Sequence, residues 1–278
     1  MRRARGWVGL TALALATAGM LPAAPGEVRS GEVREVWVSV DGRTVRALCT
    51  DGSRRVLLLH DAGAGADAWR AVLARLDGAV GACAYDRLGT GGSGPAPEDR
   101  GWFELEDEMR RIHRALGFER GYTLVGHGLA GLYARLYAAD RPTEVGALVL
   151  VDPAHEDMPR EVRPGMPAEA WEAWMAQRRA RNSDGVSEAA VAERARGTRL
   201  PRIPVTVITA TRRVYVEGLD ERFLDQAAHR THASVLKGLP IARHIPARSS
   251  HDVPLEQPDL VVDEILRVVR ISSAAHGR

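Results

Sequence analysis

Hydrophobic positions in this chain follow two alternating patterns from Val33 onward. Short runs rich in valine and leucine are typical of buried strands, and longer stretches with apolar residues three or four positions apart predict helices. The predicted strands include RRVLLLH, GACAY, YTLVGH, ALVLVDP (Ala147–Pro153) and PVTVITA (Pro204–Ala210). The predicted helices include Ala66–Leu76, Trp102–Phe118 and Leu129–Asp140. Strands that alternate with helices in this way predict a mostly parallel α/β sheet.

The first two strands are expected to pair with each other. Val33–Gly42 and Arg43–Gly52 each contain a β-rich run, and Asp41-Gly42 lies where they meet. Asp-Gly is a dipeptide that favours a tight turn between antiparallel strands. We therefore expect a β-hairpin at the start of the domain.

A polar segment, His155–Leu200, interrupts the alternation and is called the insertion below. Its helical stretch Ala168–Arg181 carries Trp171, Trp174 and Met175 on one side. In α/β sheets ligands bind outside the carboxyl ends of the strands, so an insertion here predicts a helical lid over that edge. The alternative is a peripheral pair of helices that buries these aromatic residues on the main core.

The first 24 residues have a different pattern. Arg2, Arg3 and Arg5 precede an apolar run from Trp7 to Leu21, and small residues follow at Pro22-Ala23-Ala24. This order of charged, apolar and small residues predicts a secretory signal peptide at residues 1–24. We therefore expect a secreted or otherwise extracytoplasmic protein. A membrane anchor is the alternative if the segment stays uncleaved, although the run is short of the roughly 20 apolar residues that a span needs.

Composition narrows the choice of partners. The chain of 278 residues has a formal net charge of +2 and 5% aromatic residues, and its basic residues are spread along its length. Without a basic stripe interleaved with aromatic residues, a nucleic-acid partner is not expected. No histidine pair has the spacing of metal ligands, so neither a metal nor another cofactor is expected. The expected partner is a small molecule.

Four motifs in order carry a resemblance to a known family. They are LLLHDAG, YDRLGTGGSG, LVGHGLAG and SSHDVPLEQPDLVVDEI. Together they resemble the α/β-hydrolase superfamily, in its serine esterase- and peptidase-like branch. The resemblance implies an α/β-hydrolase domain over residues 33–278, with a mostly parallel eight-stranded sheet flanked by helices and with residues 155–200 as a helical lid insertion. It also places the strand of Cys49 beside the strand of Cys83, which implies a disulfide between them.

The nucleophile position is the one departure from this family. Gly128 stands where the elbow motif G-x-S-x-G has its serine. That residue normally has strained backbone geometry, which glycine adopts without a clash at Cβ. We therefore expect the turn to persist while the attacking hydroxyl is absent.

The remaining catalytic groups are assigned by the same resemblance. His251, in the loop after a last predicted strand in ARHIPARSS, is the expected base. The acid that orients it is expected to be Asp152, at the end of a strand, with Glu217 and Asp220 as alternatives.

The family's oxyanion hole is built from backbone amides. The resemblance assigns one amide to Leu129 and the second to Asp61 or Ala62. Because backbone amides do not depend on the side chain at Gly128, the hole is expected to survive the loss of the serine.

Three hypotheses about function follow. The leading one is an impaired hydrolase homologue that still binds an ester-, amide- or acyl-like small molecule. The second is an active hydrolase that uses a water activated by His251 in the space left at Gly128, or a nucleophile outside the elbow. The third is an interaction scaffold with a vestigial pocket.

Overall fold

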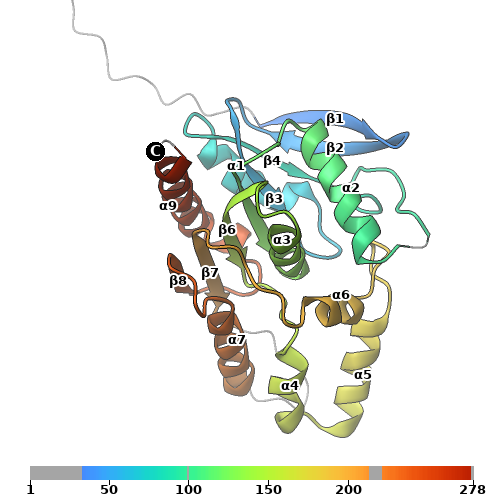
Figure 1. The fold of residues 1–278 in the computed structure, drawn as a ribbon. Helices are drawn as coiled ribbons and strands as arrows, with labels where there is room; N and C mark the ends of the chain where they lie inside the picture. The colour runs from blue at the N-terminus through green and yellow to red at the C-terminus, as the bar shows by residue number, and fades with distance from the viewer. Residues whose placement is uncertain (1–32, 99, 213–220, 277–278) are drawn as a thin grey trace, which may run out of the picture.

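The computed structural model describes residues 33–98, 100–212 and 221–276. One eight-stranded sheet in the order β1-β2-β4-β3-β5-β6-β7-β8 forms its centre (Figure 1). Its strand pairs are parallel except for β1 with β2 and β2 with β4, which are antiparallel. Its strands are β1 (Arg34–Val40), β2 (Arg43–Cys49), β3 (Arg54–Leu59), β4 (Gly81–Tyr85), β5 (Tyr122–His127), β6 (Val145–Val151), β7 (Val205–Ala210) and β8 (Ala242–Ala247). The predicted mostly parallel sheet is confirmed. The predicted signal peptide, residues 1–24, lies outside the described residues.

The predicted hairpin forms between β1 and β2. Asp41 and Gly42 connect the strands with φ angles of 50° and 75°, the left-handed geometry that a two-residue turn requires. Further along β2, Cys49 lies directly opposite Cys83 of β4, and the two cysteines are disulfide-bonded. The disulfide implied by the family resemblance is therefore present.

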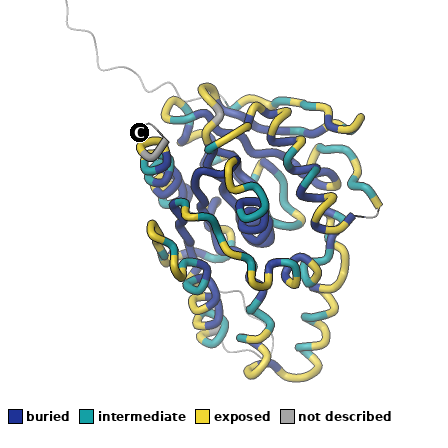
Figure 2. The backbone as a smooth tube through the Cα atoms, in the orientation of Figure 1, coloured by how far each residue is buried: buried dark blue, intermediate teal, exposed yellow. Residues whose placement is uncertain are grey.

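Alternation along the central strands produces two apolar layers. In β3, Leu57 and Leu59 point to one face of the sheet, whereas Val56 and Leu58 point to the other. The first face is covered by α2 (Trp102–Ala115) and α3 (Leu129–Asp140), and the second by α1 (Arg70–Leu76) and α9 (Pro258–His276). Helix α3 is buried along nearly its whole length, which fixes its amino end against the sheet (Figure 2).

The helices agree with the sequence apart from their ends. The predicted helix Ala66–Leu76 begins with a 3-10 turn, η1 (Ala66–Trp69), and the predicted helix Trp102–Phe118 ends three residues early. A left-handed residue, Gly117, with φ of 87°, follows the end of α2 and turns the chain toward β5. Within the described part of the chain, no helix is both long and apolar enough to cross a bilayer.

The insertion forms its own helices between β6 and β7. They are α4 (Met158–Val162), η2 (Arg163–Gly165), α5 (Ala168–Arg179) and α6 (Glu188–Ala195), which gather at one end of the molecule with α7 (Glu221–Val235) (Figure 1). Trp171 and Trp174 pack beside each other in a small apolar cluster that includes Phe223 of α7. The aromatic residues therefore pack within this end of the molecule and not on the main core.

Candidate active site

The turn at Gly128 has the geometry expected of a nucleophile elbow. Gly128 joins the end of β5 to the start of α3 with φ of 54° and ψ of −124°. Its amide donates to the carbonyl of Val151 at 3.1 Å, and its carbonyl accepts from the amide of Ala154 at 2.8 Å. These bonds fix the turn to the end of the neighbouring strand β6. The turn thus persists with hydrogen in place of a side chain, as the sequence predicts.

His251 and Asp152 meet at the carboxyl end of the sheet. His251 follows β8 and precedes α8 (Val253–Glu256), and its Nδ1 lies 2.6 Å from Oδ2 of Asp152. The Asp152 side chain is 1% exposed, and its Oδ1 accepts from the amide of Ala210 at 3.1 Å. Asp152 thus contacts the histidine in the manner of an orienting acid. Glu217 and Asp220, the alternatives, lie outside the described residues.

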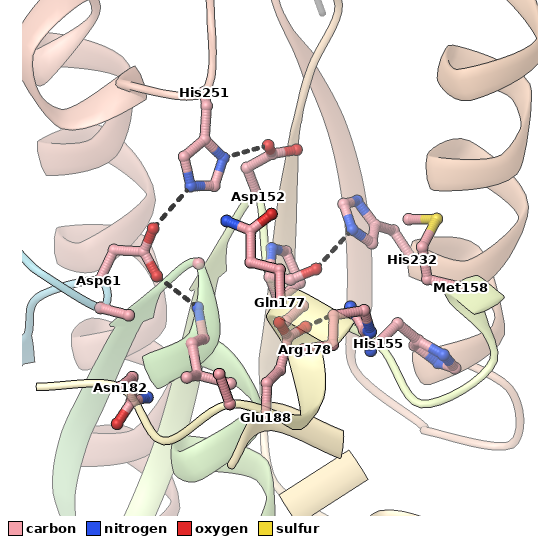
Figure 3. Close-up of a pocket in the computed structure, with 16 residues that line it drawn as sticks. Asp61, Asp152, His155, Met158, Gln177, Arg178, Asn182, Glu188, His232 and His251 are labelled. Atoms are coloured by element: carbon pink, nitrogen blue, oxygen red, sulfur yellow. Dashed lines mark hydrogen bonds and ion pairs between the residues drawn. The ribbon is translucent and has the colours of Figure 1, made fainter. Parts of the chain in front are cut away.

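The carboxylate of Asp61 occupies the space next to Gly128. Its Oδ1 accepts from the Leu129 amide at 2.6 Å, and its Oδ2 lies 2.9 Å from Nε2 of His251 (Figure 3). A Cβ added to Gly128 would lie only 2.1 Å from that Oδ1. The side chain of Asp61, from the loop after β3, therefore fills the volume that a nucleophile at position 128 would need.

This arrangement corrects one expectation about the oxyanion hole. The second amide, expected from Asp61 or Ala62, stays a prediction, but the Asp61 carboxylate also enters the site. The Leu129 amide was expected to remain open, but it is bonded to that carboxylate because an anion is stabilised at the amino end of a helix. The space beside Gly128 expected to admit an activated water holds the same carboxylate.

A buried arginine fixes the loop that carries Asp61. Arg87 donates from Nη1 to the carbonyl of His60 at 2.6 Å and from Nη2 to the carbonyl of Asp61 at 3.3 Å. His60 donates from Nδ1 to the same Asp61 carbonyl at 2.7 Å. Arg87 in turn forms a doubly bonded pair with Asp184 of the insertion, and both side chains are fully buried. The insertion thus helps to position the Asp61 backbone.

The two carboxylates keep His251 protonated. Burial favours its neutral form, but hydrogen bonds and charges from Asp152 and Asp61 outweigh this and raise the pKa of His251 to about 10. Burial would likewise raise the pKa of Asp61, but the hydrogen bond and charge of His251 lower that pKa to about 2. At neutral pH the site is therefore an imidazolium between two carboxylates.

His127 supports this cluster from β5. Its Nε2 donates to the backbone carbonyl of His251 at 2.8 Å, and the two rings lie 4.5 Å apart between centroids. Burial and the charge of His251 lower the pKa of His127 and keep it neutral. His127 is thus a positioning residue.

A cavity of about 350 Å³ opens onto the cluster. Asp61, Gly128 and His251 line it. The insertion contributes Arg178 and Glu188, which pair with each other (Figure 3). The complete set of lining residues is Asp61, Ala62, Gly128, Leu129, Asp152, Pro153, Ala154, His155, Met158, Gln177, Arg178, Ala180, Asn182, Glu188, His232 and His251. Across the described residues, no group of three His, Cys, Asp or Glu side chains is arranged to hold a metal ion.

Sequence reasoning missed the role of the Asp61 side chain. The available signal was a carboxylate in the LLLHDAG loop, which was already expected to contribute to the oxyanion hole, together with a glycine at position 128. A glycine leaves space that a neighbouring side chain can fill, and a carboxylate suits a helix amino end.

Comparisons with known proteins agree with the fold. A family profile described as alpha/beta hydrolase fold matches residues 54–227. RutD of Klebsiella pneumoniae (strain 342), provisionally named a carbamate hydrolase, is 37% identical over 102 residues, which are 36% of this chain and 38% of RutD. The matched part of the chain thus spans well under half the length of that relative.

Solved structures show the same fold over most of the chain. Haloalkane dehalogenase DatA from Agrobacterium tumefaciens superimposes with a TM-score of 0.60 at 16% identity, covering 85% of this chain and 97% of DatA. A thermophilic esterase from Thermogutta terrifontis gives a TM-score of 0.59 at 19% identity, covering 86% of this chain and 99% of the esterase. At these identities the likeness concerns the fold alone.

Proposed function

Because the chain belongs to the α/β-hydrolase fold family, we propose that it binds a small molecule in the cavity beside Gly128 and does not carry out serine-type acyl transfer. The observation that carries the proposal is the Asp61 carboxylate, bonded at once to the Leu129 amide and to His251. Loss of the nucleophile alone typically lowers turnover by ~10⁶. The position of Asp61 adds two further obstacles.

The first obstacle is at the base. A serine hydrolase needs a neutral histidine that accepts the proton of the nucleophile. Here Nε2 of His251 carries a proton and is bonded to Asp61. The second obstacle is at the oxyanion hole, because a developing oxyanion would compete with the Asp61 carboxylate for the Leu129 amide. These contacts disfavour an acyl ligand whose carbonyl oxygen would enter the hole.

No other hydroxyl takes the place of the missing serine. Among the described residues that line the cavity there is no serine, threonine, tyrosine or cysteine. Ser93 donates to the carbonyl of Asp86, and Ser250 bonds to Glu256. Ser249 is fully buried and does not line the cavity. The cavity itself supports binding of a small molecule over a purely scaffolding role.

A fluorophosphonate probe tests the loss of serine chemistry. We expect no labelled serine after prolonged incubation with the folded protein. Stoichiometric labelling of any serine would refute the proposal. Screening small molecules for an increase in melting temperature tests the binding half, and a scaffold with a vestigial pocket would give no increase with any of them.

Restoring the serine requires two changes. In Gly128→Ser the new side chain meets the Asp61 carboxylate, whereas Gly128→Ser with Asp61→Ala removes that collision and frees the Leu129 amide. We expect esterase activity toward short p-nitrophenyl esters only in the double variant, and we expect it to vanish when His251→Gln is added. Equal activity in Gly128→Ser alone would show that Asp61 does not block the site.

We also propose that the protein is exported. The disulfide between Cys49 and Cys83 supports this, because disulfides persist mainly in oxidising compartments. Fractionation of expressing cells, with determination of the mature amino terminus, tests it. Retention of residues 1–24 on a protein in the cytoplasm would contradict export.

A further inference from the structure

We propose that Asp61 is itself a nucleophile, which acts from the loop after β3 and forms a covalent ester with an electrophilic saturated carbon. The inference rests on the proposed binding of a small molecule in the cavity beside Gly128. It assigns that molecule to a chemical class and gives the Asp61 side chain a catalytic role.

The position of the carboxylate carries the argument. An elbow nucleophile is presented to both a histidine and an oxyanion amide, and the Asp61 carboxylate has both contacts, at 2.9 Å and 2.6 Å. It also lines the cavity, so that a bound molecule can reach it. The Arg87 contact with the Asp61 carbonyl holds the backbone behind it, which leaves the carboxylate oriented before a substrate enters.

Carboxylate chemistry selects the substrate. Attack on the carbonyl of an ester would give an anhydride, from which the Asp61 carboxylate is a better leaving group than an alkoxide, so the reaction would reverse. Attack on a saturated carbon gives a stable ester if that carbon carries a weakly basic leaving group or belongs to a strained ring. Small alkyl halides and epoxides have this chemistry and suit a cavity of about 350 Å³.

The first step forms a bond between Oδ2 of Asp61 and the substrate carbon. The electrons of the bond from carbon to the leaving group depart with halide, or stay on oxygen when an epoxide opens. Oδ1 remains bonded to the Leu129 amide. The product of this step is a neutral alkyl ester on Asp61, and Asp61 no longer carries the charge that held His251 protonated.

The second step uses His251 as a base. The histidine faces Asp61, Asp152 and neutral His127, so formation of the ester leaves Asp152 as the only negative charge among these neighbours. His251 can then release its proton to solvent, and this proton balances the negative charge of the leaving group. The neutral His251 next takes a proton from a water that attacks Cγ of Asp61. The resulting oxyanion is stabilised by the Leu129 amide.

Collapse of this intermediate breaks the bond between Cγ and the ester oxygen. The alkoxide takes the proton from His251 and leaves as an alcohol. The remaining proton of the added water returns from the Asp61 carboxyl to His251, which restores the ion pair. The sum is one alkyl halide and one water giving an alcohol and hydrogen halide, or one epoxide and one water giving a diol.

Trapping the ester tests the proposal. The folded His251→Gln variant is incubated with 1-bromobutane or with 1,2-epoxyhexane, and its peptides are analysed by mass spectrometry. We expect one alkyl group per chain on Asp61, none in His251→Gln with Asp61→Asn, and the same adduct in His251→Gln with the distant surface change Asp259→Asn. Absence of an adduct with both compounds, or an adduct on Asp152 or Glu188 instead, would overturn the proposal.

Isotope labelling of the wild-type protein gives an independent readout. In a single turnover in ¹⁸O-water, the label should enter the Asp61 carboxylate and not the released alcohol. Asp61→Asn should lower steady-state turnover by ~10⁴-fold or more. Label in the alcohol from the first turnover would show direct attack by water and would overturn the role of Asp61.

The proposed function and the proposed Asp61 nucleophile can be refuted independently. Labelling of a serine by the fluorophosphonate would end the proposed loss of serine chemistry, whatever the adduct experiment shows. A protein that resists the fluorophosphonate and binds small molecules, yet forms no Asp61 ester, would leave the proposed function standing and refute the nucleophile.

Discussion

Gly128→Ala tests the close fit between Gly128 and Asp61 through folding stability. The added Cβ would lie 2.1 Å from Oδ1, 2.2 Å from Cγ and 2.5 Å from Oδ2 of Asp61, so the whole carboxylate must move. Moving it gives up the bonds to the Leu129 amide and to His251. The perturbation therefore removes two charge-assisted hydrogen bonds without touching the residue that makes them.

The size of the effect follows from these two bonds. A hydrogen bond to a charged group contributes about 1.5–3 kcal/mol. The Asp61 side chain is 24% exposed and regains hydration when it moves, so we take about 2–4 kcal/mol for the pair. An alanine with φ near 54° adds strain of about 1 kcal/mol. Gly128→Ala should therefore lower the free energy of unfolding by about 3–5 kcal/mol.

A double-mutant cycle separates the collision from the strain. Asp61→Ala removes the same two bonds, so adding Gly128→Ala to it should cost little beyond the strain. We expect the double variant to be more stable than the sum of the single effects by about 2–4 kcal/mol, the contribution of the two bonds that both changes remove. The assay is urea unfolding at pH 7, followed by tryptophan fluorescence and by circular dichroism.

Gly78→Ala is the matched control. Gly78 has a φ of 74°, but a Cβ there meets no heavy atom within 4 Å, so it reports strain without a collision. Its effect should add to that of Asp61→Ala. If the effects of Gly128→Ala and Asp61→Ala also add, within about 0.5 kcal/mol, the carboxylate does not occupy the space beside Gly128 and the reasoning is wrong.

Three further predictions concern the surroundings of the site. Folding raises the pKa of His251 from 6.5 to about 10, so the stability that its protonation contributes is full below pH 6.5 and should be lost as the pH rises toward 10. Urea unfolding across this range should show a smaller loss of stability in His251→Gln than in the wild type. Asp184→Ala leaves Arg87 buried without its carboxylate and should cost about 3–5 kcal/mol in the same assay, whereas an unchanged midpoint would show that the pair does not anchor the insertion. Replacing Cys49 and Cys83 by alanine should cost about 2–4 kcal/mol, and calorimetry that finds no loss would contradict a stabilising disulfide.

Local sequence patterns were sufficient to predict most of the fold. The Asp41-Gly42 turn, the alternating residues of β3 and the helix Leu129–Asp140 depend on interactions between near neighbours in sequence. Local patterns could not predict that Cys49 lies opposite Cys83, because nothing in the sequence of either strand specifies which strand lies beside it. The resemblance to a family with a known strand order supplied it.

The site was predictable only where the family pattern applied. His251 and Asp152 meet as that pattern implies. The Asp61 side chain could not be placed, because its conformation depends on a cavity made by a glycine 67 positions later and on a histidine 190 positions later. Helical periodicity likewise placed Trp171 and Trp174 on one side of a helix, but it could not identify α7 as their partner.

The central claim is that the Asp61 carboxylate occupies the nucleophile position against His251. Nuclear magnetic resonance of the imidazole nitrogens measures this directly, through titration of His251 in the wild-type protein and in Asp61→Asn. We predict that His251 stays protonated to about pH 10 in the wild type and that its pKa falls clearly in Asp61→Asn. A His251 pKa below 7 in the wild type, unaffected by Asp61→Asn, would contradict the account.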